Sequence, residues 1–118
     1  MNFEAFANLT FPSGHFISEI VGIEGKMLDP IGRPALAKAI IEGKRITIQI
    51  SSDLNEREIG ISIYHEVLES LAVALDEPPE SVMDLNESGF EKLAQEAYLQ
   101  YGYPTPEIVL SWIGKMGF

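Results

Sequence analysis

The residues best suited to chemistry form the motif H-E-V-L-E at residues 65–69, inside an apolar stretch. It differs by one residue from the metallopeptidase motif H-E-x-x-H, because Glu69 stands where the second histidine would be. On a helix, residues four apart project from the same face, so His65 and Glu69 can bind one cation together. Glu66 then lies beside them, where a general base for a hydrolytic water would sit. The motif predicts a metal centre with Glu66 as its catalytic residue.

A third ligand has to come from elsewhere in the chain, since open catalytic zinc sites use about three protein ligands. The chain has no cysteine and two histidines, so the ligands must be histidine, carboxylate, backbone or water. Glu87, at the entrance to a later predicted helix, is the first candidate. The alternatives are Asp84, Glu91 and His15.

The same residues also fit interpretations without a metal. His65 and Glu69 could form an ordinary hydrogen-bonded pair one helical turn apart. Glu87 would be favoured near a helix N-terminus by the dipole alone, and Glu91 could complete a capping box with Ser88. Against this, a charged carboxylate on an apolar helix costs several kcal/mol to bury unless something compensates. Coordination of a metal would offset that cost.

Composition limits the class of protein. The 118 residues predict one domain, 1–118, and 46% hydrophobic with 22% charged residues is typical of a globular protein. The net charge of −10 argues against nucleic acid and anionic membranes as partners. No apolar run approaches the roughly 20 residues that cross a bilayer. The N-terminal segment lacks the features of a secretory signal, and with the absence of cysteine this favours the cytoplasm.

The first part of the chain predicts two strands. Residues 15–23 are rich in β-branched and aromatic side chains, and residues 45–51 alternate apolar and polar side chains with period two. Between them, glycine and proline breaks predict a loop over residues 25–34. Pro34 then favours a short helix from Ala35 to Ile41, ending at Gly43.

The second part predicts three helices. The first runs from about Glu56 to Leu75, with a capping box formed by Asn55 and Glu58, and apolar residues cover most of its circumference. An acidic loop over residues 76–87 follows. The second helix begins at Ser88 and closes at Gly102, and the third opens at Thr105-Pro106.

From Ile46 onward, the chain resembles the minimal zincin-type metallopeptidases, small zinc peptidases that cleave phage repressors and regulators. In that family an edge strand precedes a helix with H-E-x-x-H. A following helix carries E-x-x-A-N-x-F-A, whose first glutamate is the third zinc ligand. Residues 46–51 take the place of the strand, and residues 87–94 that of the last motif, with Glu87 on the glutamate. The resemblance implies zinc held by His65 and Glu87, with Glu66 activating water for peptide hydrolysis.

Glu69 departs from the family motif, which has a histidine at this position. One imidazole and two carboxylates neutralise a divalent cation, which then lowers the pKa of water less. Zinc is the expected metal, although more oxygen ligands also suit manganese or iron. We expect an α+β fold, a small zincin-like β-sheet with helices packed on one side, that acts on a protein or peptide. The alternative is a catalytically inactive zincin-like domain that serves as a structural or protein-interaction module, with a homodimer as one form.

Overall fold

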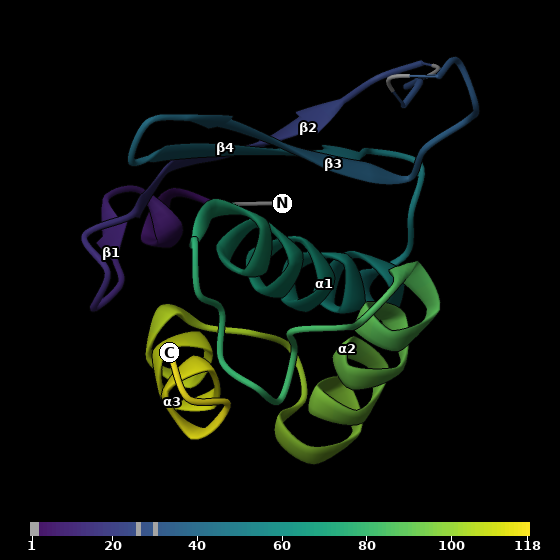
Figure 1. The fold of residues 1–118 in the computed structure, drawn as a ribbon. Coiled ribbons are helices and arrows are strands. Elements are labelled where there is room, and N and C mark those ends of the chain that lie inside the picture. Colours follow the sequence, from purple (N-terminus) through teal and green to yellow (C-terminus); the bar gives the residue numbers. More distant parts are fainter. Residues whose placement is uncertain (1–2, 26, 30) are drawn as a thin grey trace.

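The computed structural model describes residues 3–25, 27–29 and 31–118, which form a four-stranded mixed sheet and three α-helices (Figure 1). All three helices lie on one side of the sheet (Figure 1), so the predicted α+β class is confirmed. Within the described residues, no helix is long and apolar enough to span a bilayer.

The strands are arranged in the order β1-β2-β4-β3. Strands β2 and β4 run parallel, whereas β1 pairs antiparallel with β2, and β3 antiparallel with β4. Their bounds are β1 Leu9–Thr10, β2 Phe16–Ile23, β3 Ala37–Glu42 and β4 Arg45–Ser51. The predicted strands at residues 15–23 and 45–51 are thus present. The two-residue strand β1 and a short 3-10 helix, Glu4–Phe6, were not predicted.

The helix predicted from Ala35 to Ile41 is wrong, because residues Ala37–Glu42 form strand β3. Alanine, lysine and glutamate favour a helix locally, but here the backbone pairs with β4 along its whole length. Gly43 begins a tight turn at φ +61°, and Glu42 faces Arg45 across it. Glycine at the first central position of a two-residue loop is typical of a hairpin, so the turn joins two strands.

The loop predicted over residues 25–34 is present in its described part, with one isolated bridge between Leu28 and Pro34. Lys26 and Pro30 lie outside the described residues. This loop connects β2 to β3. Strand β3 pairs with the edge of β4 that faces away from β2.

The sheet buries one face of isoleucines. Ile46, Ile48 and Ile50 on β4 are buried, as their period-two spacing predicts. On β2, Ile17 and Ile20 are both buried although they are an odd number of residues apart. A register shift between Ile17 and Glu19 explains this, because an extra residue in a bulge returns the next side chains to the same face.

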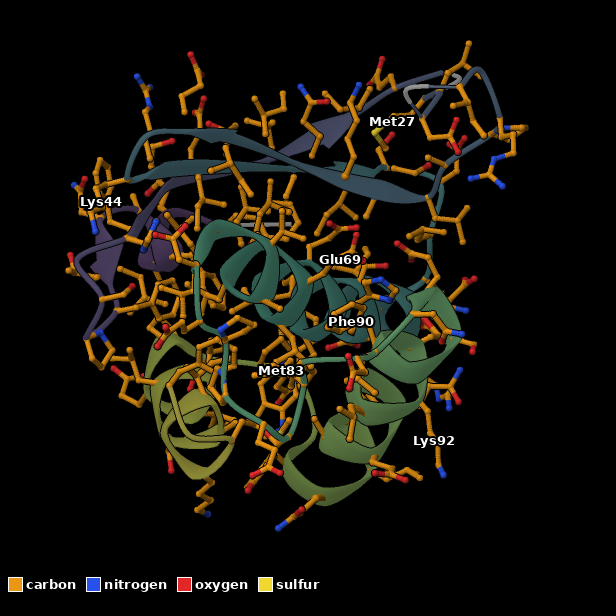
Figure 2. The ribbon with its side chains drawn as sticks, viewed as in Figure 1. Met27, Lys44, Glu69, Met83, Phe90 and Lys92 are labelled. Carbon is orange, nitrogen blue, oxygen red and sulfur yellow. The ribbon has the colours of Figure 1, made fainter. Side chains whose placement is uncertain are left out.

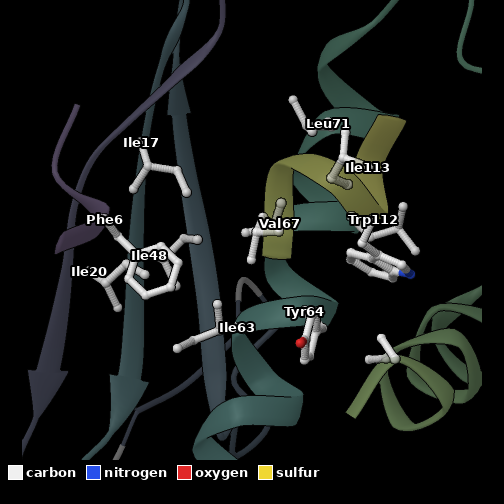
Figure 3. Packing of buried hydrophobic residues seen from close by; sticks show 14 of the residues in the cluster. Phe6, Ile17, Ile20, Ile48, Ile63, Tyr64, Val67, Leu71, Trp112 and Ile113 are labelled. Carbon is white, nitrogen blue, oxygen red and sulfur yellow. The ribbon is translucent and has the colours of Figure 1, made fainter. Parts of the chain in front are cut away.

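Helix α1, Glu56–Ala74, lies between the sheet and α3. Figure 3 shows Ile63 and Val67 facing the isoleucines of the sheet, while Tyr64 meets Trp112 on the opposite side. The ring centroids of Tyr64 and Trp112 are 5.1 Å apart in an edge-on arrangement. A helix packed on both sides needs apolar residues nearly all round, as the sequence indicated.

The predicted capping box of α1 is confirmed. The Asn55 side chain accepts from the Glu58 amide at 2.8 Å, and the Glu58 carboxylate accepts from the Asn55 amide at 3.2 Å. These two bonds satisfy backbone donors that the first turn of a helix leaves free. Local chemistry therefore sets where α1 begins, and with it the position of the motif 65–69.

Helix α2 covers Glu87–Tyr101 and α3 covers Pro106–Lys115. The cap of α2 is Asn86, whose side chain accepts from the Gly89 amide. The predicted capping box of Ser88 with Glu91 is wrong, because Ser88 is already inside the helix and donates its hydroxyl to Asn86. The Glu91 side chain points to His65 instead.

Candidate metal centre

Three side chains from two helices converge beside α1. His65 Nε2 lies 2.8 Å from Glu69 Oε2 on the same helix and 3.1 Å from Glu87 Oε2 on α2. One donor atom from each residue can be chosen so that all lie within 4.8 Å of one another. An imidazole nitrogen and two carboxylate oxygens are ligands that a divalent cation accepts, so this donor set fits a metal ion.

The local structure explains the convergence. His65 and Glu69 are four positions apart, which places both on one face of α1. Glu87 is the first residue of α2, directly after its cap Asn86, so it projects from the helix end that lies against α1. An acid at this position is also favoured by the helix dipole. Figure 2 labels Glu69 on α1 and Phe90 on α2, and the Phe90 ring centroid lies 6.3 Å from that of His65.

Carboxyl groups outnumber the one imidazole in this cluster, and each group shifts the pKa of its neighbours. Burial tends to lower the pKa of His65, but hydrogen bonds and charge from Glu69, Glu66 and Glu91 outweigh it and raise the pKa to about 9. The hydrogen bond from His65 lowers the pKa of Glu69. The pKa of Glu87 is raised, first by desolvation and then by its hydrogen bond to Glu69. Two carboxyl groups this close need a shared proton or a cation between them.

Glu66 adjoins this cluster without belonging to it. Its side chain is 9% exposed, and burial, opposed by the charge of His65, raises its pKa to about 7. Among the described residues, nothing donates a hydrogen bond to its carboxyl group. A carboxyl group with a pKa near 7 can gain and lose a proton at neutral pH, which is what a general base requires.

A groove of about 680 Å³ opens over these residues. One side is a single face of α1, on which residues recur three and four positions apart. These residues are Ser62, His65, Glu66, Glu69, Ser70 and Val73. Strand β3 and the segment before it form the facing wall, and Glu87 and Glu91 of α2 close one side. The face of α1 spans about 16 Å of helix, the length of roughly five residues of extended peptide.

The remaining candidates for the third ligand, Asp84, His15 and Glu91, lie outside the group of His65, Glu69 and Glu87. Asp84 is exposed and belongs to neither the cluster nor the groove lining. His15 is buried just before β2, where its Nδ1 lies 2.8 Å from the hydroxyl of Ser13. Glu91 contacts His65, but on Nδ1 at 3.3 Å, the nitrogen away from Glu69 and Glu87.

Tyr64, next to His65 in the sequence, points away from the cluster. Its hydroxyl donates to the Gly102 carbonyl at 3.0 Å, and its ring is fully buried. It therefore packs the core and does not face the groove. The arginine and lysine side chains among the groove residues are those of Arg33 and Lys38.

Two parts of the site were missed in the sequence. The wall from Leu36 to Ile41 was predicted as a helix, although the two-residue spacing between Glu42 and Arg45 is a hairpin signal. The contact of Glu91 with His65 was also missed. Its signal is the i, i+4 spacing from Glu87, which puts both acids on the same face of α2.

Comparisons of the chain with protein-family models, with curated proteins and with solved structures found no match.

Proposed function

We propose that this protein is a metal-dependent hydrolase of peptide bonds with a zincin-like site of the variant form H-E-x-x-E. The observation that carries the proposal is the convergence of His65, Glu69 and Glu87, whose donor atoms lie within 4.8 Å of one another. His65 and Glu69 come from one helix and Glu87 from another, so two separate elements bring their donor atoms to one point. Neighbouring carboxylates help to raise the pKa of Glu66 and of Glu87, and a cation would offset that negative charge.

The metal would supply Lewis acidity, which polarises a substrate carbonyl and makes water more acidic. We expect zinc, and the oxygen-rich donor set also suits manganese or iron. His65, Glu69 and Glu87 would hold it, and their two negative charges balance those of a divalent ion. Its electrophilic power is therefore lower than with two imidazoles, so we expect slow turnover.

Glu66 would act as the general base. Its carboxyl group lines the groove next to the ligand cluster and is free of hydrogen bonds from the described residues. In its ionised form it can take a proton from water attacking the scissile carbonyl, and then pass this proton to the leaving amine. Burial raises the pKa of Glu66, and a bound cation would favour its ionised form, the form that accepts the proton.

The groove supports a peptide as substrate. Strand β3 is the last strand of the sheet, and no other strand among the described residues pairs with its outer edge. An extended peptide can hydrogen-bond to such an edge. Leu36, Ile41 and the 69%-exposed Val73 offer apolar contacts for its side chains. The length of the groove matches a short extended segment better than a compact small molecule.

A specific observation also favours a second candidate, a catalytically inactive interaction module. Protonated His65 can donate through Nε2 to Glu69 and Glu87 and through Nδ1 to Glu91, which closes the cluster without a metal. In that case the imidazolium is the cation of the site. The acidic surface would then bind a protein partner or a second copy of the chain.

Metal analysis distinguishes the two candidates. Protein purified without chelator, then titrated with Zn²⁺ or Mn²⁺, should bind about one ion. His65→Ala and Glu69→Ala should abolish this binding, whereas Glu96→Gln, an exposed acid on α2, should leave it unchanged. Cleavage of a peptide library should need the metal, and Glu66→Gln should stop cleavage while retaining the ion. Absence of binding under both metals would refute the hydrolase.

A further inference from the structure

The side of the His65 ring opposite the proposed metal has a carboxylate partner of its own. Glu91 Oε2 lies 3.3 Å from Nδ1, while Nε2 faces Glu69 and Glu87. Glu91 follows Glu87 by one turn of α2, so one helix face supplies both a ligand and this contact. We propose that Glu91 is a positioning residue: its carboxylate accepts the Nδ1–H of His65 and keeps the lone pair of Nε2 directed at the cation. This inference rests on the proposed metal site.

The physical basis is the tautomer of the imidazole. A neutral histidine carries one N–H, and only the other nitrogen has a lone pair for a metal. An acceptor held against Nδ1 therefore selects the tautomer in which Nε2 is the ligand. A carboxylate in this role also orients the ring and makes the ligating nitrogen more basic, and its loss typically costs 10–100-fold in metal affinity.

A second contact from α2 sets the ring plane. The ring of Phe90, the residue before Glu91, lies 6.3 Å from the His65 ring between centroids, at 46°. Only 13% of the His65 side chain is exposed, so few other orientations are open to it. Helix α2 thus orients the imidazole through Phe90 and Glu91 and offers Glu87 as a ligand beside it.

Three substitutions separate the hydrogen bond from the charge. Glu91→Gln keeps an acceptor oxygen at the same reach but removes the charge, Glu91→Asp keeps the charge but shortens the reach, and Glu91→Ala removes both. Competition titrations of the full chain with Zn²⁺ should show a loss of about 10–100-fold for Glu91→Asp and Glu91→Ala, and a smaller loss for Glu91→Gln. Glu96→Gln, on the same helix, should match the wild type.

The tautomer can be observed directly, because the chain has two histidines and His15 serves as an internal reference. Long-range ¹H–¹⁵N spectra of the Zn²⁺-loaded wild type should show the proton of His65 on Nδ1. In Glu91→Ala this proton should exchange faster with water. His15, whose Nδ1 pairs with Ser13, should give the same spectrum in both proteins.

The proposal is overturned if Glu91→Asp binds Zn²⁺ like the wild type while Glu91→Gln binds like Glu91→Ala, because charge alone then explains the effect. A proton on Nε2 in the loaded protein also overturns it. These results would leave the metal site itself intact. Failure of the wild type to bind Zn²⁺ would instead remove the proposed function together with this inference. Circular dichroism of each variant shows whether it is folded.

Discussion

Glu66 is buried in the folded protein and its carboxyl group titrates abnormally, so replacing it with glutamine should raise stability while abolishing activity. Burial, opposed by the charge of His65, raises the Glu66 pKa from 4.5 to about 7. The ionised carboxylate is therefore less favourable in the folded protein than in the unfolded chain. Glutamine has nearly the same shape and is neutral at every pH.

The expected gain depends on pH. The unfolded chain releases this proton near pH 4.5 and the folded protein near pH 7, so between these values the unfolded state binds fewer protons. The stability of the wild type consequently falls as pH rises from about 4.5 to 7 and stays reduced above 7. At 1.36 kcal/mol per pKa unit, the penalty at pH 8 is about 3 kcal/mol. Glu66→Gln should remove it, which corresponds to roughly 10 °C in Tm for a chain of this size.

Urea denaturation of the metal-free protein at pH 8 and pH 4 measures this gain. Glu66→Gln should unfold at higher urea than the wild type at pH 8, and at nearly the same urea at pH 4, where both side chains are neutral. Glu96→Gln is the matched control, since this glutamate is exposed on α2 and should change stability little at either pH. Zn²⁺ should reduce the gain, because a nearby cation favours ionised Glu66.

Three results would contradict these expectations. A gain of the same size at pH 4 and pH 8 would show that the effect comes from packing and not from ionisation. Equal stability of Glu66→Gln and the wild type at pH 8 would show that Glu66 is not held with a raised pKa. If Glu66→Gln retains both the metal and peptide cleavage, the assignment of Glu66 as general base is wrong.

Further perturbations test other parts of the structure. Binding of Zn²⁺ should displace the proton that His65 holds with a pKa of about 9. The Zn²⁺ affinity, measured with an indicator dye, should therefore rise about tenfold per pH unit between pH 7 and 9 for each proton displaced. Above pH 9 the affinity should level off. In urea denaturation, Gly60→Ala should cost about 1–3 kcal/mol, since its Cβ would lie 2.6 Å from Tyr98 Cε2. Gly114→Ala meets nothing within 4 Å and should gain up to about 1 kcal/mol. Asn55→Ala should cost about 1 kcal/mol by loss of the helix cap.

The following results would contradict these predictions. An affinity that is flat from pH 7 to 9 would mean that no proton leaves His65 on binding. If Gly60→Ala is as favourable as Gly114→Ala, the close packing of α1 against Tyr98 is incorrect. Unchanged stability of Asn55→Ala would show that the capping box adds nothing to the start of α1.

Local signals in the sequence determined much of the site. The capping box of Asn55 and Glu58 places the first turn of α1, and helical spacing then puts His65 and Glu69 on one face. The period-two isoleucines of β4 identify its buried side. These features depend on residues within a few positions of one another, so they can be predicted without knowledge of the fold.

The tertiary structure alone decided what surrounds that helix face. Residues Ala37–Glu42 have side chains that suit a helix, and only pairing with β4 makes them a strand and a wall of the groove. The choice of Glu87 over Asp84 depends on where α2 begins against α1.

The electrostatic properties of the site also come from the fold. Glu91 reaches Nδ1 of His65 from 26 positions along the chain. The raised pKa of Glu66 arises because burial in the fold removes water from its carboxyl group. Strand pairing, burial and electrostatic coupling all depend on distances between residues remote in sequence, and a linear pattern does not contain those distances.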